Sequence, residues 1–228
     1  MRKQGYMGGR AHSKAEQVYD ALKEAILSGA LEPGAPIDKL ALCDRLGVSR
    51  FPVSAAISRL AFEQLVLVEP QHGSFVARIS ADDARERLFI RRALEGEIAA
   101  EAAQRLDSNG RAALEENIRK AAKAVETGDR TTFYTLDVDF HAALTSHLRL
   151  DRSGEILDGL RAHLERVRRL LMLPPGRMQA TLGEHGAIVE AILSTDARRA
   201  RASMEAHIGA MTTMVENFAR ERPELFYP

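Results

Sequence analysis

The sequence has one cysteine and therefore cannot form a disulfide within the chain. Disulfides persist in oxidising compartments, so a chain of 228 residues with a single cysteine is typical of a reducing compartment. The residue, Cys43, follows the apolar spacing of Leu40 and Leu46, which favours a small core residue.

Long apolar runs are also absent. No stretch approaches the roughly 20 apolar residues that a membrane-spanning helix needs. The first residues, MRKQGYMGGRAHSKAEQ, carry positive charge but have no apolar segment behind them, so they do not form a secretory signal. These absences predict a cytoplasmic protein that has no membrane partner.

The chain has no net charge, because 32 Lys and Arg balance 32 Asp and Glu. The whole chain therefore gives no electrostatic argument for a nucleic-acid partner. Residues 1–79 hold ten basic and eight acidic residues, and this excess of two positive charges is too small by itself to indicate a nucleic-acid partner. The hydrophobic fraction of 45% and the charged fraction of 28% are ordinary for a soluble globular protein of one large domain or two modest ones.

Composition divides the chain into three parts. Residues 1–12 are glycine-rich and polar, which predicts a disordered tail. Residues 13–79 combine helix and turn signals with two short β-rich runs. Residues 80–228 are rich in Ala, Leu, Arg and Glu and have no strand pattern, which predicts an antiparallel all-α bundle. The expected fold class is therefore mainly α.

The order of elements in residues 13–79 is that of a winged helix-turn-helix. Apolar periodicity predicts helices over 13–28, 38–45 and 49–64, and the runs LVLVE and FVARI, joined by the turn PQHGS, predict a hairpin. In the bundle, breaks rich in Gly, Pro, Asn and Asp separate helices predicted at about 81–106, 110–126, 130–148, 152–173, 177–194 and 196–221.

The stretch LGVSRFPVSAAISRL has two different faces. Ser49 is expected to cap the helix by accepting a backbone N–H bond, and Pro52 suits the first turn. Apolar residues recur at helical spacing on one face. The opposite face has no large aliphatic side chain, and we predict that it reads DNA in the major groove. It carries Arg50, Phe51, Ser54, Ser58 and Arg59.

These residues carry a resemblance to a known family. The segment VYDALKEAILSGALEPGAPI, the run LGVSRFPVSAA and the hairpin resemble the winged helix of GntR-type bacterial transcriptional regulators, over roughly residues 14–79. In that family the Ser and Arg at the helix start contact phosphates and bases, and the wing tip enters the minor groove. The resemblance implies these roles for Ser49 and Arg50 and, at the tip, for His72 and Gly73.

Two departures from the family pattern lie on the reading face. Ser54 and Ala55 stand where the family usually has Arg-Glu, and Phe51 stands where Thr is usual. Ser54 reaches less far than Arg and has no charge, so we expect an unusual operator and a shallower salt dependence. For Phe51, contact with a thymine methyl and folding back on the domain remain alternatives.

One aspartate and several histidines of the bundle stand on apolar helix faces. Asp137 and His141 in LDVDFHAAL are four residues apart, hence on one side of a helix. His185 and His207 each occur in a later predicted helix. Any one of them alone is more typical of a hydrogen-bonded or exposed histidine. Together, three nitrogen donors and one oxygen donor fit a divalent transition metal with open positions left.

Residues 80–220 are similar to the FCD ligand-binding domain that follows the winged helix in the FadR-like branch of this family. There the metal ligands are an Asp-x-x-x-His pair and two later histidines, and the matching residues are Asp137, His141, His185 and His207. This ligand set is compatible with Zn, Ni or Mn. Asp139, His147 and His163 do not match this ligand pattern, and we expect them to lie on the surface or behind the metal ligands.

The same resemblance implies an effector. In relatives the ion often helps to bind a small carboxylic acid, and Arg91 matches a position that often faces the ligand. A solvated surface position for Arg91 is the alternative. Arg92 points about 100° away from it on a helix.

The sequence thus predicts a homodimeric transcriptional regulator, not an enzyme, which binds operator DNA under the control of a small organic or sugar acid. Two rivals are kept: a metal-dependent enzyme and a regulator whose metal is purely structural. The enzyme hypothesis lacks a convincing general base. Glu184 adjoins His185 in sequence, but its side chain projects from the helix in a different direction from that of His185.

Overall fold

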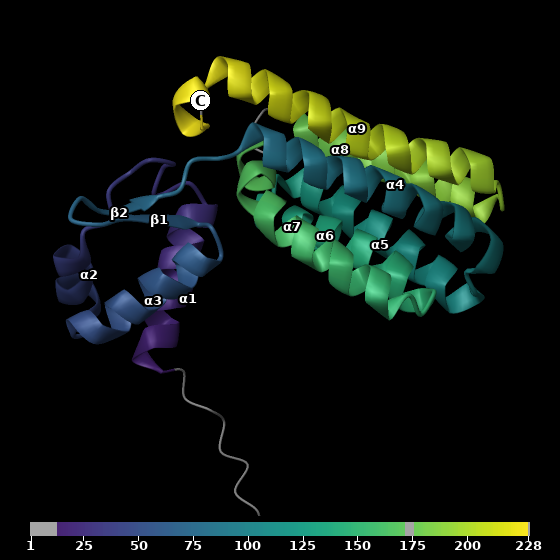
Figure 1. The fold of residues 1–228 in the computed structure, drawn as a ribbon. Helices are drawn as coiled ribbons and strands as arrows, with labels where there is room; N and C mark the ends of the chain where they lie inside the picture. Colours follow the sequence, from purple (N-terminus) through teal and green to yellow (C-terminus); the bar gives the residue numbers. More distant parts are fainter. Residues whose placement is uncertain (1–12, 172–175, 228) are drawn as a thin grey trace, which may run out of the picture. The chain divides into compact units, whose positions relative to one another are not determined.

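The computed structural model describes residues 13–171 and 176–227, drawn in colour in Figure 1. The predicted tail, residues 1–12, and the end of the helix predicted over 152–173 lie outside the described residues. The chain separates into two compact units, Met1–Arg78 and Ile79–Pro228, which are described one at a time. None of the helices in the described ranges has both the length and the apolarity of a membrane span.

Within its described residues, 13–78, the first unit has three helices and a two-stranded sheet (Figure 1). The helices are α1 (Lys14–Leu27), α2 (Lys39–Leu46) and α3 (Arg50–Phe62), and the strands are β1 (Val66–Glu69) and β2 (Gly73–Val76). Their apolar faces form one core that includes Leu22, Ile26, Val53 and Leu60, and half-buried Cys43 packs against it. This is the predicted winged helix-turn-helix.

The start of α3 differs from the prediction in one respect. Ser49 is the N-cap residue, but its hydroxyl makes no capping hydrogen bond, so the expected cap is wrong. Capping bonds come from the backbone N–H two or three residues on. The third residue here is Pro52, which has no N–H, and the exposed hydroxyl of Ser49 does not accept from Phe51 either.

The hairpin is tighter than predicted. The antiparallel register pairs Glu69 with Gly73 and Val68 with Ser74, so the last two residues of the predicted PQHGS turn belong to β2. The turn itself consists of residues 70–72. Gly73, at φ +126°, occupies a backbone conformation that other residues rarely adopt, which explains a glycine at this edge of the wing.

The second unit is an antiparallel bundle of helices (Figure 1). The helices are α4 (Ala81–Arg105), α5 (Ser108–Thr127), α6 (Arg130–His147), α7 (Asp151–Leu171), α8 (Arg177–Leu193) and α9 (Ala197–Glu221). With the first unit, this arrangement confirms the predicted fold class.

The helix α5 begins two residues earlier than predicted. The sequence Ser108-Asn109-Gly110 was expected to be a break, yet it forms the first turn of the helix. Asp107 caps this turn by accepting from the N–H of Gly110 at 2.8 Å. A Cβ at Gly110 would lie 2.7 Å from the side chain of Leu106, so this glycine serves close packing and does not end a helix.

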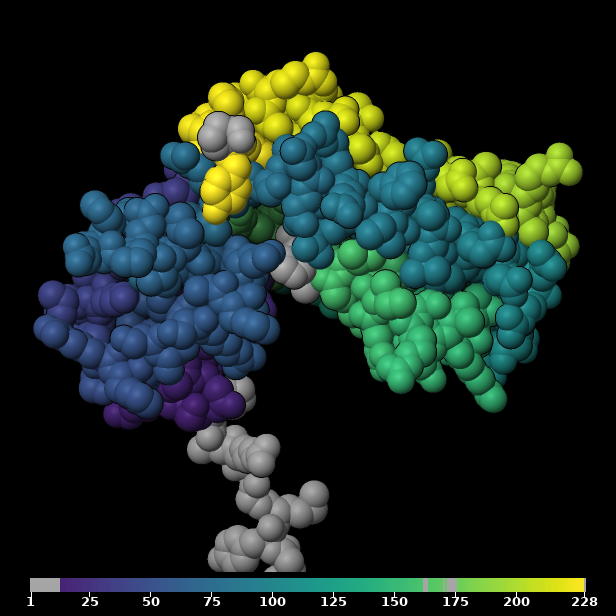
Figure 2. All heavy atoms as spheres, viewed as in Figure 1, coloured from purple at the N-terminus to yellow at the C-terminus, as the bar shows by residue number. Residues whose placement is uncertain are grey.

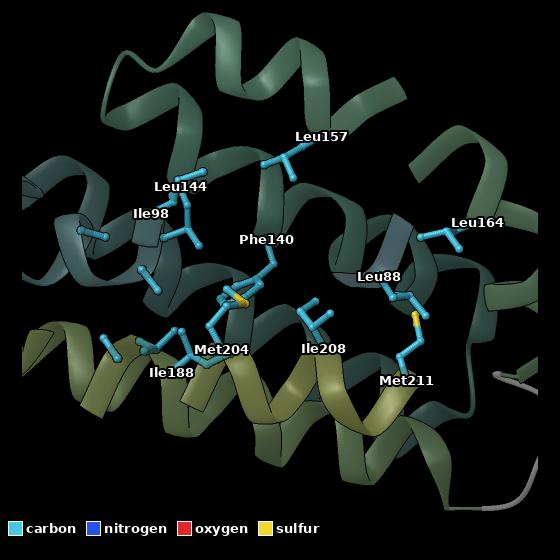
Figure 3. Packing of buried hydrophobic residues seen from close by; sticks show 14 of the residues in the cluster. Leu88, Ile98, Phe140, Leu144, Leu157, Leu164, Ile188, Met204, Ile208 and Met211 are labelled. Atoms are coloured by element: carbon cyan, nitrogen blue, oxygen red, sulfur yellow. The ribbon is translucent and has the colours of Figure 1, made fainter. Parts of the chain in front are cut away.

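The bundle core takes residues from α4, α5, α6, α7, α8 and α9, and α4 and α9 run side by side (Figure 2). Figure 3 shows Phe140 of α6 pointing into this core beside Met204 of α9. After α9, a short 3-10 helix, η1 (Pro223–Leu225), returns the chain to the start of the bundle. There the backbone of Ile79 pairs with Leu225 and Tyr227 at 2.9 Å. This pairing of the chain end with the start of the bundle was not predicted from the sequence.

Candidate metal centre and nucleic-acid interface

The structure brings Asp137, His141, His185 and His207 together inside the bundle. The first two lie one turn apart on α6, and the others come from α8 and α9. All four are buried, and one ligand atom from each lies within 4.8 Å of the others. Nε2 of His207 is 3.3 Å from Nε2 of both His141 and His185, and Nε2 of His185 is 3.5 Å from Oδ1 of Asp137. Four donor atoms therefore converge on one point.

Burial keeps the three histidines neutral. Desolvation lowers the pKa of His207 to about 4, although the contact with Glu184 opposes this, and desolvation holds the pKa of His185 well below its ordinary value. Desolvation also lowers the pKa of His141, although Glu95 opposes this. At neutral pH each ring carries one proton and one lone pair, which is the form that binds a metal ion.

Two glutamates lie behind the histidines. Oε2 of Glu95, on α4, is 2.5 Å from Nδ1 of His141. Oε2 of Glu184, on α8, is 2.7 Å from Nδ1 of His207. Because a carboxylate only accepts, each contact places the ring proton on Nδ1 and leaves a bare lone pair on Nε2.

The Nδ1–H tautomers of His141 and His207 bear on whether a metal ion fits between the two rings. The 3.3 Å contact between Nε2 of His141 and Nε2 of His207 would set two lone pairs against each other, which is repulsive unless a cation lies between them. Two nitrogen ligands about 2.1 Å from one ion at tetrahedral angles lie about 3.4 Å apart. The donor set and its spacing therefore fit a divalent transition metal.

Three arginines lie around these side chains. Arg91 of α4 and Arg161 and Arg168 of α7 are 1%, 5% and 1% exposed. Arg168 pairs with Oδ2 of Asp137. Nε of Arg91 donates to Oε1 of Glu95 at 2.6 Å, and Nη2 of Arg161 lies 3.8 Å from Oε2 of Glu95. Three buried guanidinium groups thus face two buried carboxylates.

The buried position of Arg91 overturns the alternative of a solvated surface residue, whereas its neighbour Arg92 is exposed. Several donors of the cluster are not used. Nη1 of Arg91, Nε of Arg161 and Nη1 of Arg168 have no hydrogen-bond partner within residues 13–171 and 176–227. Buried donors without acceptors are costly, so the cluster favours the binding of an anion.

In the first unit, the outward face of α3 carries the residues predicted to read DNA. Arg50, Phe51, Ser54, Ser58 and Arg59 are all exposed. Phe51 is 82% exposed, so the alternative that it folds back on the domain is wrong. An aromatic ring held in solvent between small polar side chains is available for contact with a base.

Arg59 differs from the rest of this face because it has partners within the domain. Its guanidinium lies over the ring of Tyr19, 3.7 Å from the centroid, and Nε is 3.4 Å from Oε1 of Glu63. At the wing, His72 is exposed in the turn and Gly73 is exposed at the start of β2.

Comparison with known proteins identifies the chain. Residues 14–76 match the family described as bacterial regulatory proteins, gntR family, and residues 86–210, more than half of the chain, match the FCD domain. The chain belongs to the GntR family. It is a DNA-binding transcriptional regulator with a GntR winged helix and an FCD domain.

This GntR regulator has relatives along nearly its full length. It is 28% identical over 211 residues to the HTH-type transcriptional repressor RspR of Escherichia coli (strain K12), with 92% of each chain covered. It is 32% identical to an uncharacterized HTH-type transcriptional regulator in an unstable DNA locus of Streptomyces ambofaciens, over 92% of this chain and 88% of that one. The structure of E. coli McbR/YncC superposes on this one with a TM-score of 0.70 at 23% sequence identity. The superposition covers 91% of this chain and 99% of that one, which indicates a shared fold.

Two residues of the site in this GntR regulator, Glu95 and Glu184, were not among those predicted from the sequence. Glu95 lies four residues after Arg91, so helical spacing was an available signal. Glu184 does project away from His185, but that direction leads to His207 on another helix. Of the unassigned residues, Asp139 and His147 are exposed, and the side chain of His163 lies outside the described part of the structure.

Proposed function

We propose that this regulator senses a small organic or sugar acid, which binds beside a divalent transition metal held by Asp137, His141, His185 and His207. The observation that carries the proposal is the convergence of four buried donors within 4.8 Å. When bound, the ion would offer open coordination positions to a carboxylate oxygen.

The arginine cluster favours an acidic effector. The guanidinium groups of Arg91 and Arg168 have donors left over, and a guanidinium pairs well with a carboxylate. A divalent cation would add further positive charge to a site in which three buried arginines face the buried carboxylates of Glu95 and Asp137, with the exposed Asp158 as a further acidic partner. In this proposal the acid supplies the compensating negative charge, with Arg91 as an effector-binding residue.

The proposed regulation joins the two parts of the chain. Residues 13–79 would be the DNA-binding domain and residues 80–228 the sensing and dimerisation domain of a cytoplasmic homodimer. Two-fold symmetry would present two copies of α3 to the half-sites of an operator. The acid would change operator affinity only by as much as it distinguishes two arrangements of the dimer.

On α3 and the wing we assign DNA contacts to the exposed residues of the reading face and the turn. Ser49, whose hydroxyl caps nothing, and Arg50 would contact phosphates and bases at the helix start. The other proposed contacts are Phe51, Ser54, Ser58, Arg59, His72 and Gly73.

The test is a thermal-shift screen of the Zn²⁺-loaded, full-length protein against monocarboxylic, dicarboxylic, hydroxy and sugar acids. A ligand of the native state raises the melting temperature. We expect an acid that stabilises the wild type and the Arg92→Ala control but not Arg91→Lys, which keeps the charge and loses the planar fork. The same acid should change the affinity for operator DNA.

The screen also separates the rivals. Stabilisation by Zn²⁺ without any effect of acids on melting or DNA binding would favour a structural metal and overturn sensing. Chemical conversion of a stabilising acid would favour the enzyme. Against that rival, Glu184 is already engaged by His207 at 2.7 Å and by both terminal nitrogens of Arg177 at 2.9 and 2.8 Å.

A further inference from the structure

Two histidines of the metal centre contact a glutamate through Nδ1, and the third stacks on an aromatic ring. Glu95 contacts Nδ1 of His141 at 2.5 Å, and Glu184 contacts Nδ1 of His207 at 2.7 Å. The ring of His185 instead stacks on Phe140, with centroids 4.0 Å apart and an angle of 16° between the planes. In both glutamate pairs the carboxylate and the imidazole come from different helices.

We propose that Glu95 and Glu184 are positioning residues of the metal centre. Each fixes the Nδ1–H tautomer of one histidine and turns the bare Nε2 toward the shared point. This inference rests on the metal site of the proposed function and adds two side chains that belong to no predicted ligand set. Partners of this kind raise the basicity of the ligand and reduce the rotation that metal binding must freeze.

Further contacts hold both carboxylates in place. Oε1 of Glu95 accepts from Nε of Arg91 at 2.6 Å. The two carboxylate oxygens of Glu184 accept from the two terminal nitrogens of Arg177 at 2.9 and 2.8 Å. Anionic acceptors form the stronger contacts with an imidazole N–H.

The two glutamates differ in what else they hold. Glu95 is buried and shared between His141 and the arginines, so it links the metal centre to the proposed acid site. The side chain of Glu184 is 24% exposed, and its other partner is Arg177, the first residue of α8. Glu184 is therefore the better position for substitution, because less of the core depends on it.

The first measurement is the affinity of full-length protein for Zn²⁺, by competition with a chromophoric chelator. We expect Glu184→Ala to weaken Zn²⁺ binding by about 10- to 100-fold. Glu184→Gln should recover part of the loss, because its amide oxygen still accepts from Nδ1. The control is Glu190→Gln on the same helix, whose side chain is 66% exposed and pairs with Arg199, and it should bind as the wild type does.

The second measurement reads the tautomer of His207 directly, by long-range ¹⁵N–¹H NMR of the metal-free protein. The wild type should show a protonated Nδ1 and a bare Nε2, and Glu184→Ala should show a mixture of the two tautomers. A merely structural role for Glu184 would change the melting temperature and leave this signature intact. Glu95→Gln, with folding checked by circular dichroism, should change the signature of His141 in the same way.

Two failures are distinguishable. A wild-type chain that binds no Zn²⁺ would overturn the metal site of the proposed function together with this inference. A wild type that binds tightly, with unchanged affinity and an unchanged His207 tautomer in Glu184→Ala, would overturn this inference alone.

Discussion

The guanidinium of Arg59 lies 3.7 Å from the centre of the Tyr19 ring, although Arg59 belongs to the exposed face of the proposed reading helix. Tyr19 in turn donates to Glu63 at 2.7 Å, and Lys23 donates to both. The reading face of α3 is therefore attached to α1 through Arg59. This distinguishes Arg59 from Arg50, the arginine at the other end of the same face.

The first prediction separates those two arginines. Arg50→Ala should weaken binding to selected operator DNA and reduce the slope of log affinity against log salt by about 1, because one phosphate contact is lost. Arg59→Ala should change that slope less and should lower the free energy of unfolding by about 0.5–1 kcal/mol, because the contact with Tyr19 is lost. Salt titrations and urea unfolding of both variants measure this. Equal slopes for the two variants would contradict the distinction.

The second prediction concerns pH and the same cluster. Burial would raise the pKa of Glu63, but hydrogen bonds from Lys23 and Tyr19 and the charge of Arg59 lower it. A lowered pKa in the folded state stabilises the fold above the ordinary value of 4.5, and this stabilisation disappears as pH falls through the folded value.

Glu63→Gln should therefore lower the free energy of unfolding by about 0.5–1 kcal/mol at pH 7, a modest amount because solvent screens the cluster. Against the wild type, this difference should shrink toward zero as pH drops below 4.5. Glu69→Gln removes an exposed carboxylate of the same unit and serves as the control. Urea titrations at several pH values provide the comparison, and a pH-independent difference would refute the explanation.

The third prediction is the loss of metal on substitution of ligands from two different helices. The double variant His185→Ala, His207→Ala should contain no divalent metal after purification, because two of the four convergent donors are removed. A chelator should lower the melting temperature of the wild type and leave that of the variant unchanged. His147→Ala, on an exposed position of α6, should retain the metal. Elemental analysis that finds equal metal in all three proteins would reject the site.

Much of the fold could be predicted because most helices have a strong apolar period and clear ends. The prediction was wrong where packing overrides a local signal. Gly110 resembles a helix break, but Asp107 caps the first turn of α5 at this residue, and the side chain of Leu106 leaves no room for a Cβ. Ser49 resembles a cap, but it makes no capping bond, and Pro52 removes one of the two donors that a cap can bind.

The candidate metal site, like the fold, could be predicted from the sequence only in part. The spacing of Asp137 and His141 follows from one helix, and the two later histidines were grouped with them from their apolar helix faces, with support from the family resemblance. The partners behind them depend on how helices pack, since Glu184 contacts a histidine on α9 while its neighbour in sequence is a histidine on α8. A single sequence does not contain that geometry.

The fourth prediction uses the departure from the family pattern at position 54. Ser54 is exposed on α3 and uncharged, so Ser54→Arg should add a phosphate or guanine contact. The salt slope should become steeper by about 0.9 for each phosphate neutralised. Selection from random DNA should then favour guanine at one position of each half-site. An unchanged slope together with an unchanged preference would exclude a DNA contact at this position.

The last prediction concerns Phe51. Its ring is 82% exposed at the start of α3, and an exposed apolar ring beside a major-groove surface can contact the C5-methyl of thymine. Replacing thymine by uracil, one position at a time, should weaken wild-type binding at one position of each half-site. Phe51→Ala should bind the thymine and uracil operators equally, whereas Arg50→Ala should still discriminate between them. The four affinities of wild type and Phe51→Ala on the two DNAs form a double-mutant cycle, whose coupling free energy isolates this contact from general loss of affinity. A coupling free energy of zero at every thymine would show that the ring reads no methyl group.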